Sequence, residues 1–489
     1  MARINCFITS ASASVSPKLL LELKSSENVE NIYVLTSENS LAKEFENYDL
    51  LLIDDIYSTQ TIKKIASRAD SEYSIIIAST NMIEPGQFFI NRFLRIAEET
   101  GAGLLYSDHL YSREGKQVPH PVIDYQQGSL RDDFDFGPVW FINNKAFINY
   151  VKNSDKDYKY AGFYQLRLSI SRSWQLFRIP EYLYTVHAVD QRTSGKKIFD
   201  YVDPKNRDLQ MEMEEAVTSH LKKTGAYLEP KFKEIDPVNN DFPVEASVVI
   251  PVRNREKTIG DAIESVMKQK TGFIFNLIIV DNHSTDKTTE ILKEYASNYE
   301  NLVHIIPEQK DLGIGGCWNL AVHDSRCGKF AVQLDSDDLY SDETTLEKII
   351  KVFYEEKCAM VIGSYRMTNF NLEEIPPGII DHKEWTPDNG SNNALRINGL
   401  GAPRAFFTPV LREIKIPNVS YGEDYAVGLA ISRNYKIGRI YTPVYLCRRW
   451  EDNTDASLSI EAMNKHNFYK DRIRTIEYQV RIRMNNLND

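Results

Sequence analysis

The chain contains two related stretches of sequence, and this internal repeat limits its fold more than any other feature. The segment 73–109 aligns without a gap on the segment 330–366, through a strand pattern, a helix pattern and a second strand pattern. Farther along, LSISRS at 168–173 matches LAISRN at 429–434. Similarity of this length between two halves of one chain indicates that a single domain occurs twice. We therefore predict two tandem domains of the same fold.

In each half, short apolar runs alternate with helical patterns. In the second half, helical segments near 256–269 and 315–325 separate the apolar runs ASVVIPV, FNLIIVD, LVHII and KFAVQL. The first half has the weaker runs INCFIT, NIYVLTS, YDLLLID and YSIIIAS. This alternation predicts an α/β fold with doubly wound parallel sheets, of the nucleotide-binding kind. Ligands of such sheets bind at the carboxyl ends of the strands.

A segment rich in proline and charged residues separates the two halves. It covers 225–245, and its composition is typical of a linker. We therefore predict a first domain at 1–224, this linker, a second domain at 246–460 and a terminal helix at 461–489.

The terminal segment has the pattern of a basic amphipathic helix. Its apolar side chains recur at helical spacing, at Tyr469, Ile473, Ile476 and Val480. Basic side chains occupy the other faces: Lys465, Lys470, Arg472, Arg474, Arg481 and Arg483. Such a helix either lies on an anionic membrane or packs against the protein with its basic face in solvent. The pattern leaves both interpretations open.

Charge and cysteine content narrow the classes of function. The chain has 58 basic and 69 acidic residues and a net charge of −11, which does not suit a nucleic-acid-binding protein. Its 5 cysteines form no C-x-x-C pair, which argues against a disulfide framework or a structural zinc site. No run of about 18 apolar residues occurs, and the first residues do not resemble a signal peptide. We expect a cytoplasmic protein and leave open peripheral contact with the inner face of a membrane, and oligomerisation.

The sharpest local feature is LDSDDLY at 334–340, an acidic turn directly after an apolar strand. Asp335, Asp337 and Asp338 would therefore lie at the ligand-binding edge of the sheet. Three adjacent carboxylates repel one another unless a cation neutralises them. Oxygen ligands of this kind suit Mg²⁺ or Mn²⁺, which commonly share their coordination shell with substrate phosphates. The alternative is an acidic turn that caps the next helix.

Five motifs occur in an order that resembles a known family. They are SVVIPVRNREKTI, LIIVDNHSTDKT, GIGGCWNLAV, LDSDDLY and YGEDYAVGLAI. This series is similar to the inverting glycosyltransferases of family 2, which have the GT-A fold. The resemblance covers residues 245–460. It implies transfer of a sugar from a nucleotide sugar, most often a UDP-sugar, to a hydroxyl of a glycan or lipid-linked acceptor in polysaccharide or glycoconjugate synthesis.

The resemblance also implies roles for individual residues. Donor contacts would come from Pro251, Arg253, Glu256, Asp281, Asn319, Asp335 and Ser336. Asp335 and Asp337 would hold Mn²⁺ or Mg²⁺. Asp424 would be the general base, with Glu423 beside it, because inverting transfer needs a carboxylate on the sugar face opposite the leaving group.

Several further residues are implied less directly. The glycines at 313, 315 and 316 would let the backbone approach the ligand closely. Arg404 is expected to contact an acidic group, Arg448 to steady the diphosphate and Trp450 to stack on a sugar. Members of the family often carry a histidine metal ligand near this point. Here no histidine lies between His382 and His466, so the third ligand stays open.

The first copy lacks the acidic residues of the second. Opposite 335–338 stand Ala78, Ser79, Thr80 and Asn81. Opposite Glu423 and Asp424 stand Gly162 and Phe163. We therefore predict a degenerate, non-catalytic first domain.

Three alternatives remain from the sequence. The acids at 108, 132, 133 and 135 could form an independent site that makes the chain bifunctional. Both domains could instead form a carbohydrate-binding scaffold, against which the acids at 335, 337 and 424 argue. A nucleotidyltransferase would carry glycines where PVRNREKT has none.

Overall fold

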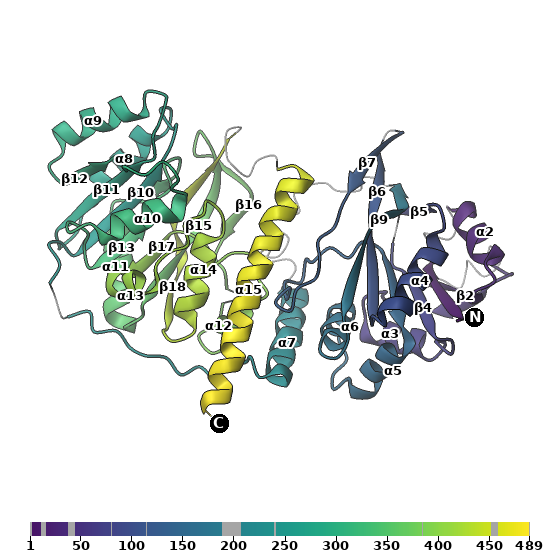
Figure 1. The fold of residues 1–489 in the computed structure, drawn as a ribbon. Coiled ribbons are helices and arrows are strands. Elements are labelled where there is room, and N and C mark those ends of the chain that lie inside the picture. The colour runs from purple at the N-terminus through teal and green to yellow at the C-terminus, as the bar shows by residue number, and fades with distance from the viewer. Residues whose placement is uncertain are drawn as a thin grey trace. The chain divides into compact units, whose positions relative to one another are not determined.

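The computed structural model describes residues 2–10, 16–37, 45–79, 81–113, 115–187, 207–238, 241–383, 385–450 and 458–488. The chain forms two compact units (Figure 1). The described residues up to 187, together with 207–227 and 458–488, belong to the first unit. Residues 228–450 belong to the second. Along the sequence, the second unit thus lies between the main part of the first unit and the terminal helix.

Each unit is built on one curled sheet, and the two sheets have the same plan. The first contains β1 (Ile4–Thr9), β2 (Val29–Thr36), β3 (Asp49–Leu52), β4 (Tyr73–Ile77), β5 (Met82–Pro85), β6 (Leu104–Arg113), β7 (Lys116–His120), β8 (Val139–Asn143) and β9 (Leu176–His187). The second contains β10 (Ala246–Val252), β11 (Phe275–Asp281), β12 (Leu302–Ile305), β13 (Phe330–Gln333), β14 (Leu339–Tyr340), β15 (Met360–Asn369), β16 (Glu374–Ile380), β17 (Arg404–Phe407) and β18 (Ile437–Arg449).

The strand order confirms the repeat that the sequence predicts. In the first sheet the order is β3-β2-β1-β4-β8-β6-β9-β5, with β7 on β6. In the second it is β12-β11-β10-β13-β17-β15-β18-β14, with β16 on β15. Strand by strand, each position in one sheet has its counterpart in the other. The chain therefore holds two tandem copies of one α/β domain.

The sheets are mixed, which corrects the expectation of wholly parallel sheets. β10, β11, β12 and β13 pair with one another in parallel, as the alternation of strands and helices predicts. β17, however, runs antiparallel between β13 and β15. β17 comes after the long segment 381–403, so its direction depends on distant pairing that a local pattern does not contain.

Helices cover the faces of each sheet. Those of the first unit are α2 (Pro17–Ser25), α3 (Thr59–Ala66), α4 (Phe89–Thr100), α5 (Asn144–Asn153), α6 (Gly162–Ser171), α7 (Arg207–Thr224) and α15 (Ile460–Asn488). Those of the second are α8 (Ile259–Met267), α9 (Thr288–Asn298), α10 (Ile314–His323), α11 (Thr345–Glu356), α12 (Gly390–Asn393), α13 (Thr408–Ile414) and α14 (Glu423–Ser432). None of the helices in the described part of the chain is long and apolar enough to cross a membrane.

The predicted linker at 225–245 is ordered over most of its described length. The N–H of Lys233 donates to the carbonyl of Asn434 (2.8 Å), and the N–H of Ile235 donates to the carbonyl of Lys357 (3.0 Å). The buried ammonium of Lys329 donates to the carbonyl of Pro237 (2.9 Å). The segment from residue 228 therefore packs as part of the second unit.

The terminal helix α15 presents different faces from those that its sequence suggests. Ile476, expected on the packed face, is 54 % exposed, whereas Arg474 and Arg481 are fully buried. Buried carboxylates neutralise both arginines: Asp471 accepts from Arg474 at 2.9 Å, and Glu477 accepts from Arg481 at 2.7 Å. The amphipathic interpretation is therefore wrong for these residues, because ion pairs allow basic side chains to be buried. Arg474 and Arg481 are not available to a membrane surface.

Candidate active site

The acidic turn of the second unit follows β13 and is held by β18. The carboxylate of Asp335 accepts from the side chain of Gln333 (2.8 Å), and its N–H donates to the hydroxyl of Tyr445 (3.1 Å). The carboxylate of Asp338 accepts the N–H of Arg448 (2.8 Å). Ser336, between them, is buried. The turn is therefore fixed at the carboxyl end of β13, where a sheet of this kind binds its ligand.

Burial and the negative charges of this turn raise the pKa values of two of its carboxyl groups. Burial raises the pKa of Asp335, and the charge of Asp337 adds to this effect. Burial raises the pKa of Asp338 well above its ordinary value, and the charges of Asp335 and Asp337 contribute. The charge of Arg404 opposes these effects at Asp335, and Arg255 lies 3.8 Å from the carboxylate of Asp337.

The same turn fits a divalent ion that shares its shell with a substrate. Among the described residues, no three His, Cys, Asp or Glu side chains are placed to hold a metal by themselves. Mg²⁺ and Mn²⁺ do not need such a cage, because they bind through one or two carboxylates with water and phosphate oxygens. Asp335 and Asp337, on the acidic turn at the carboxyl end of β13, are the residues that would hold such an ion. His466, the remote third candidate, lies on α15 of the first unit.

A second acidic pair begins α14. Asp424 forms an ion pair with Arg404, at 2.8 Å between carboxylate and guanidinium. Arg404 is the first residue of β17, and its N–H donates to the side-chain oxygen of Gln333 (3.1 Å). The amide of Gln333 thus holds both the acidic turn, through Asp335, and the strand that carries Arg404. This arrangement confirms the expected acidic partner of Arg404.

Gln333 is a functional candidate that motif reasoning missed. It lies in the apolar strand FAVQ and is 3 % exposed. A buried amide in a strand must find hydrogen-bond partners, and these partners are the two halves of the candidate site. The signal in the sequence is a polar residue that interrupts an apolar run directly before an acidic turn.

Glu423 has a different environment from Asp424. Burial, followed by the charge of Asp424, raises the pKa of Glu423 to about 7. Its Oε2 atom is buried without a hydrogen-bond partner. Arg404 feels the charges of both acids and of Asp335, and these outweigh burial, so that its pKa is raised. At neutral pH the pair therefore contains one carboxylate held by Arg404 and one carboxyl group that is partly protonated.

The loops after β10 and β11 hold each other at the expected nucleotide side of the site. The N–H of Glu256 donates to Asp286 (3.1 Å), and its carboxylate accepts the N–H of Lys287 (3.0 Å). The side-chain oxygen of Asn254 accepts the N–H of Thr285 (2.7 Å). Glu256 therefore orders these loops through backbone contacts.

Asp281 is fully buried at the end of β11. Its carboxylate accepts from the N–H of Ser284 (3.0 Å) and the hydroxyl of Thr289 (2.5 Å). Burial alone would raise its pKa, but the imidazole of His304, 3.6 Å away, and hydrogen bonds from Thr289 and Ser284 outweigh burial and lower it. Asp281 is thus an ionised residue that shapes the turn. Pro251 lies beside this end in β10, and Arg253 is exposed after it.

The Gly-rich start of α10 and Asn319 contact protein and not open space. The side-chain amide of Asn319 donates to the carbonyl of Ile416 (2.6 Å) and accepts its N–H (3.0 Å). The N–H of Gly315 donates to the carbonyl of Val419 (2.9 Å). A side chain at Gly315 would overlap the carbonyl oxygen of Pro417. The glycines therefore allow the segment 416–419 to approach α10, and that segment leads into Glu423 and Asp424.

We predict that Gly315→Ala displaces this segment and impairs the site. Overpacking of this kind costs about 1–3 kcal/mol, so the melting temperature of the second unit and kcat should both fall. The control is Gly260→Ala on α8, where an added Cβ would have Tyr295 as its nearest neighbour at 3.5 Å. Alanine favours a helix over glycine by about 1 kcal/mol, so this control should be neutral or stabilising. Equal behaviour of the two variants in thermal unfolding would contradict the packing role of Gly315.

Aromatic and basic residues border the acidic turn on the side of β18. The guanidinium of Arg448 donates to Asp261 (2.8 Å) and to the carbonyl of Asp337 (2.6 Å). The indole N–H of Trp450 lies 3.4 Å from the carboxylate of Asp337. Phe370, at the end of the β15–β16 hairpin, packs on Trp450 with ring centres 5.7 Å apart. Motif reasoning missed Asp261 and Phe370, which belong to no short motif.

The equivalent edge of the first sheet has aromatic rings in place of charges. The strand pairing places Trp140 of β8 at the position of Arg404 in β17. Phe163 is the second residue of α6, as Asp424 is the second residue of α14. Trp140 and Phe163 pack edge to face at 5.0 Å, where the second unit has its ion pair.

The acidic turn of the second unit also has no counterpart in the first. β4 and β13 pair with β1 and β10 in the same register, so Ala78 lies at the position of Asp335. Thr80, at the position of Asp337, lies outside the described residues. Three of the acids considered for a separate site are bound within their own unit: Asp108 by Arg178, Asp133 by Arg131, and Asp135 by the imidazole of His120.

The second unit is thus an α/β domain in which Arg404 joins the acidic turn at the carboxyl end of β13 to a carboxylate on α14. Residues 247–412 match the model of the family "Glycosyl transferase family 2". The second unit therefore carries a family 2 glycosyltransferase domain.

Curated relatives match about half of the chain. The poly(ribitol-phosphate) beta-glucosyltransferase of Bacillus spizizenii is 26 % identical over 233 residues, which is 46 % of this chain and 35 % of that protein. The minor teichoic acid biosynthesis protein GgaB of Bacillus subtilis is 27 % identical over 243 residues, 46 % of this chain and 25 % of that protein. The alignments thus span only 35 % and 25 % of the length of these two relatives.

A solved structure is also similar to part of this chain. S. aureus TarS residues 1–349, in complex with UDP-GlcNAc, aligns with a TM-score of 0.39 and 24 % identity. The alignment covers 48 % of this chain and 66 % of that one.

Proposed function

We propose that the second unit is a metal-dependent, inverting glycosyltransferase that moves a sugar from a UDP-sugar to a hydroxyl of a polyol-phosphate or related polysaccharide chain. The observation that carries this proposal is the link between the two acidic elements. Gln333 and Arg404 join the turn at Asp335 to the carboxylate of Asp424. The relatives that act on poly(ribitol-phosphate) or in teichoic acid synthesis support the acceptor class.

Each acidic element has a separate task in this proposal. Asp335 and Asp337 would hold a divalent ion, which would supply Lewis-acid stabilisation of the leaving diphosphate. Asp424 takes the proton of the acceptor hydroxyl, and its ion pair with Arg404 keeps it ionised and oriented. The guanidinium of Arg448, fixed by Asp261, lies beside the acidic turn and balances its charge.

The first unit is, in this proposal, a non-catalytic copy. Trp140 occupies the position of Arg404, and Phe163 occupies that of the base, Asp424. Ala78 replaces the first aspartate of the turn. Neither an alanine nor an aromatic ring holds a metal ion or accepts a proton. The cysteines are all free thiols, four of them buried, which supports a place in the reducing cytoplasm.

The first experiment is a measurement of UDP release from a panel of UDP-sugars with and without Mn²⁺. Wild type is expected to release UDP from one donor, and Asp337→Asn is expected to lower this rate by about 10²-fold or more, because it removes a metal ligand. Asp342→Asn is the control: Asp342 is exposed and accepts the N–H of Thr344 (2.8 Å), which asparagine can also do. Metal-independent release, or equal loss in both variants, would refute the proposed site.

A further inference from the structure

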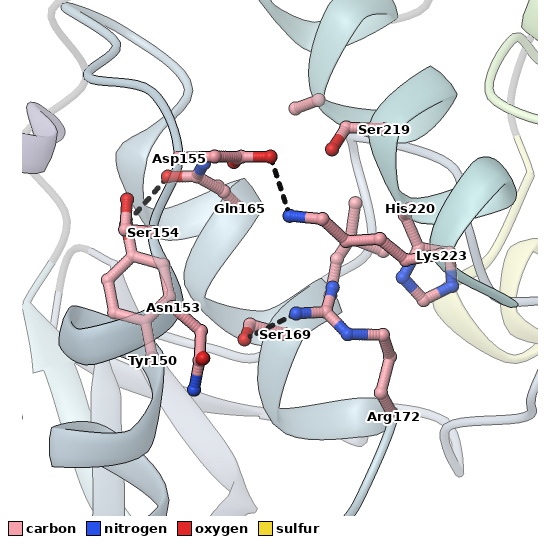
Figure 2. Close-up of a pocket in the computed structure, with 12 residues that line it drawn as sticks. Tyr150, Asn153, Ser154, Asp155, Gln165, Ser169, Arg172, Ser219, His220 and Lys223 are labelled. Carbon is pink, nitrogen blue, oxygen red and sulfur yellow. Dashed lines mark hydrogen bonds and ion pairs between the residues drawn. The ribbon is translucent and has the colours of Figure 1, made fainter.

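The first unit contains a polar pocket, and neither Trp140 nor Phe163 lines it. It is formed by the end of α5, by α6 and by α7, as Figure 2 shows. The residues that line it include Asp155, Gln165, Ser169, Arg172, His220 and Lys223. All of them belong to the first unit. Its polar lining distinguishes it from the apolar core beneath the sheet.

Arg172 is a partly buried cation without a carboxylate partner among the described residues. Its guanidinium donates to the hydroxyl of Ser169 at 2.9 Å (Figure 2). Burial lowers the pKa of Arg172, and the nearby charge of Asp155 opposes this only in part. Asp155 is itself bound to Lys223, at 2.8 Å. A partly buried guanidinium with no counterion is costly, and an anion would remove that cost.

His220 supplies a different kind of group to the pocket. Its side chain is 3 % exposed, and burial, with the charges of Arg172 and Arg167, lowers its pKa to about 3. The ring is therefore neutral. It forms a hydrogen bond with the carbonyl of Leu168, whereas its Nδ1 atom has no hydrogen-bond partner among the described residues. Because a neutral imidazole donates with one nitrogen only, Nδ1 is a buried acceptor that lacks a donor.

The positions of Arg172 and Lys223 at helix ends explain part of why basic residues occur here. Arg172 is the C-cap residue of α6, and Lys223 lies in the last turn of α7, where cations are favoured. Capping does not explain a buried acceptor beside an unpaired guanidinium. These two groups together match a ligand that carries an anion and a hydroxyl donor.

We propose that this pocket binds the phosphate of a phosphorylated polyol, with Arg172 and Lys223 on the phosphate and Nδ1 of His220 accepting a hydroxyl of the polyol. The inference rests on the proposed function in one respect: such a group would belong to the acceptor chain, which the first unit would hold while the second unit glycosylates it. Planar guanidinium and ammonium groups recognise phosphate oxygens through charge-assisted hydrogen bonds.

The test is calorimetric binding of three probes to the full chain, with UDP and Mn²⁺ present to occupy the donor site. Glycerol 3-phosphate should bind more tightly than inorganic phosphate, and glycerol alone should not bind. Arg172→Ala should weaken glycerol 3-phosphate binding about tenfold or more, as expected for loss of a charged hydrogen bond. Lys223→Ala should weaken it as well. Lys222→Ala is the matched control, because Lys222 is the preceding residue of α7 and packs over Tyr227, outside the pocket.

The outcomes separate this inference from the proposed function. Binding that Arg172→Ala does not change, in a variant whose melting temperature is unaltered, would overturn the pocket. If Arg172→Ala lowers the melting temperature, Lys223→Ala, at an exposed position, decides the question. Arg172-dependent binding without UDP release from any donor would leave the pocket standing and refute the transferase. Metal-dependent UDP release without glycerol 3-phosphate binding would refute the pocket and leave the transferase standing.

Discussion

Replacing Asp424 by asparagine is expected to lower kcat for sugar transfer by about 10²–10⁴-fold, because an amide cannot take the proton of the acceptor hydroxyl. Asparagine has nearly the same shape and can still accept a hydrogen bond from Arg404, which lies 2.8 Å from Asp424. The affinity for the UDP-sugar should therefore change little. The measurements are kcat for transfer to an acceptor and the dissociation constant of the donor.

Glu423→Gln is the matched variant for this prediction, since it makes the same chemical change one residue earlier. The folded pKa of Glu423, about 7, lies above the ordinary value of 4.5, so wild type carries a neutral carboxyl group at low pH. Glutamine is neutral at every pH. Wild type and Glu423→Gln should thus have similar kcat below pH 7 and differ only above it. A full loss in Glu423→Gln with activity retained in Asp424→Asn would assign the base to Glu423.

The raised pKa of Glu423 also makes the stability of the second unit depend on pH. Between pH 4.5 and about 7 the folded protein binds more protons at Glu423 than the unfolded chain does, so stability from this group falls as pH rises through this window. Glutamine removes this dependence. The second unit of the Glu423→Gln variant should therefore melt above wild type at pH 8 and near wild type at pH 5.

The acidic residues of the site could be named from sequence because each lies in a short motif. Asp335, Asp337 and Asp424 follow a strand or begin a helix, and both positions are visible in local patterns. Gln333 and Asp261 could not be named in this way. Their importance comes from hydrogen bonds to Arg404 and Arg448, which lie far away in the chain. Only the fold brings these partners together.

The domain repeat was likewise available from sequence, whereas the packing of α15 was not. A repeat leaves a gapless match between two halves. The faces of α15 instead depend on which charges can be paired when buried, and that depends on residues more than 300 positions away. Asp471 accepts from the hydroxyl of Ser129 (2.9 Å), and its carboxylate lies 3.3 Å from the guanidinium of Arg131. Hydrophobic periodicity contains no information on such a network.

Replacing Asp471 by alanine is therefore expected to destabilise the first unit strongly. Asp471 is fully buried, and it accepts from Arg474 (2.9 Å) as well as contacting Arg131, which is 2 % exposed. Removing the carboxylate leaves two buried guanidinium groups without this partner, a change that costs about 3–5 kcal/mol. Domains are stable by only about 5–15 kcal/mol, so the loss should be large in thermal unfolding and in hydrogen exchange around Ser129.

The control for this change lies in the same helix. Glu461 is exposed in the first turn of α15, where an acid stabilises the helix by about 0.3–1 kcal/mol. Glu461→Ala should therefore lower the melting temperature of the first unit far less than Asp471→Ala does. Because the second unit has its own core, metal-dependent UDP release should persist in Asp471→Ala at temperatures where the second unit is folded. If UDP release is lost in parallel with the stability of the first unit, the second unit depends on the first for its fold. If both variants have small and equal effects on the melting temperature, the buried ion pairs of α15 do not hold this helix in place.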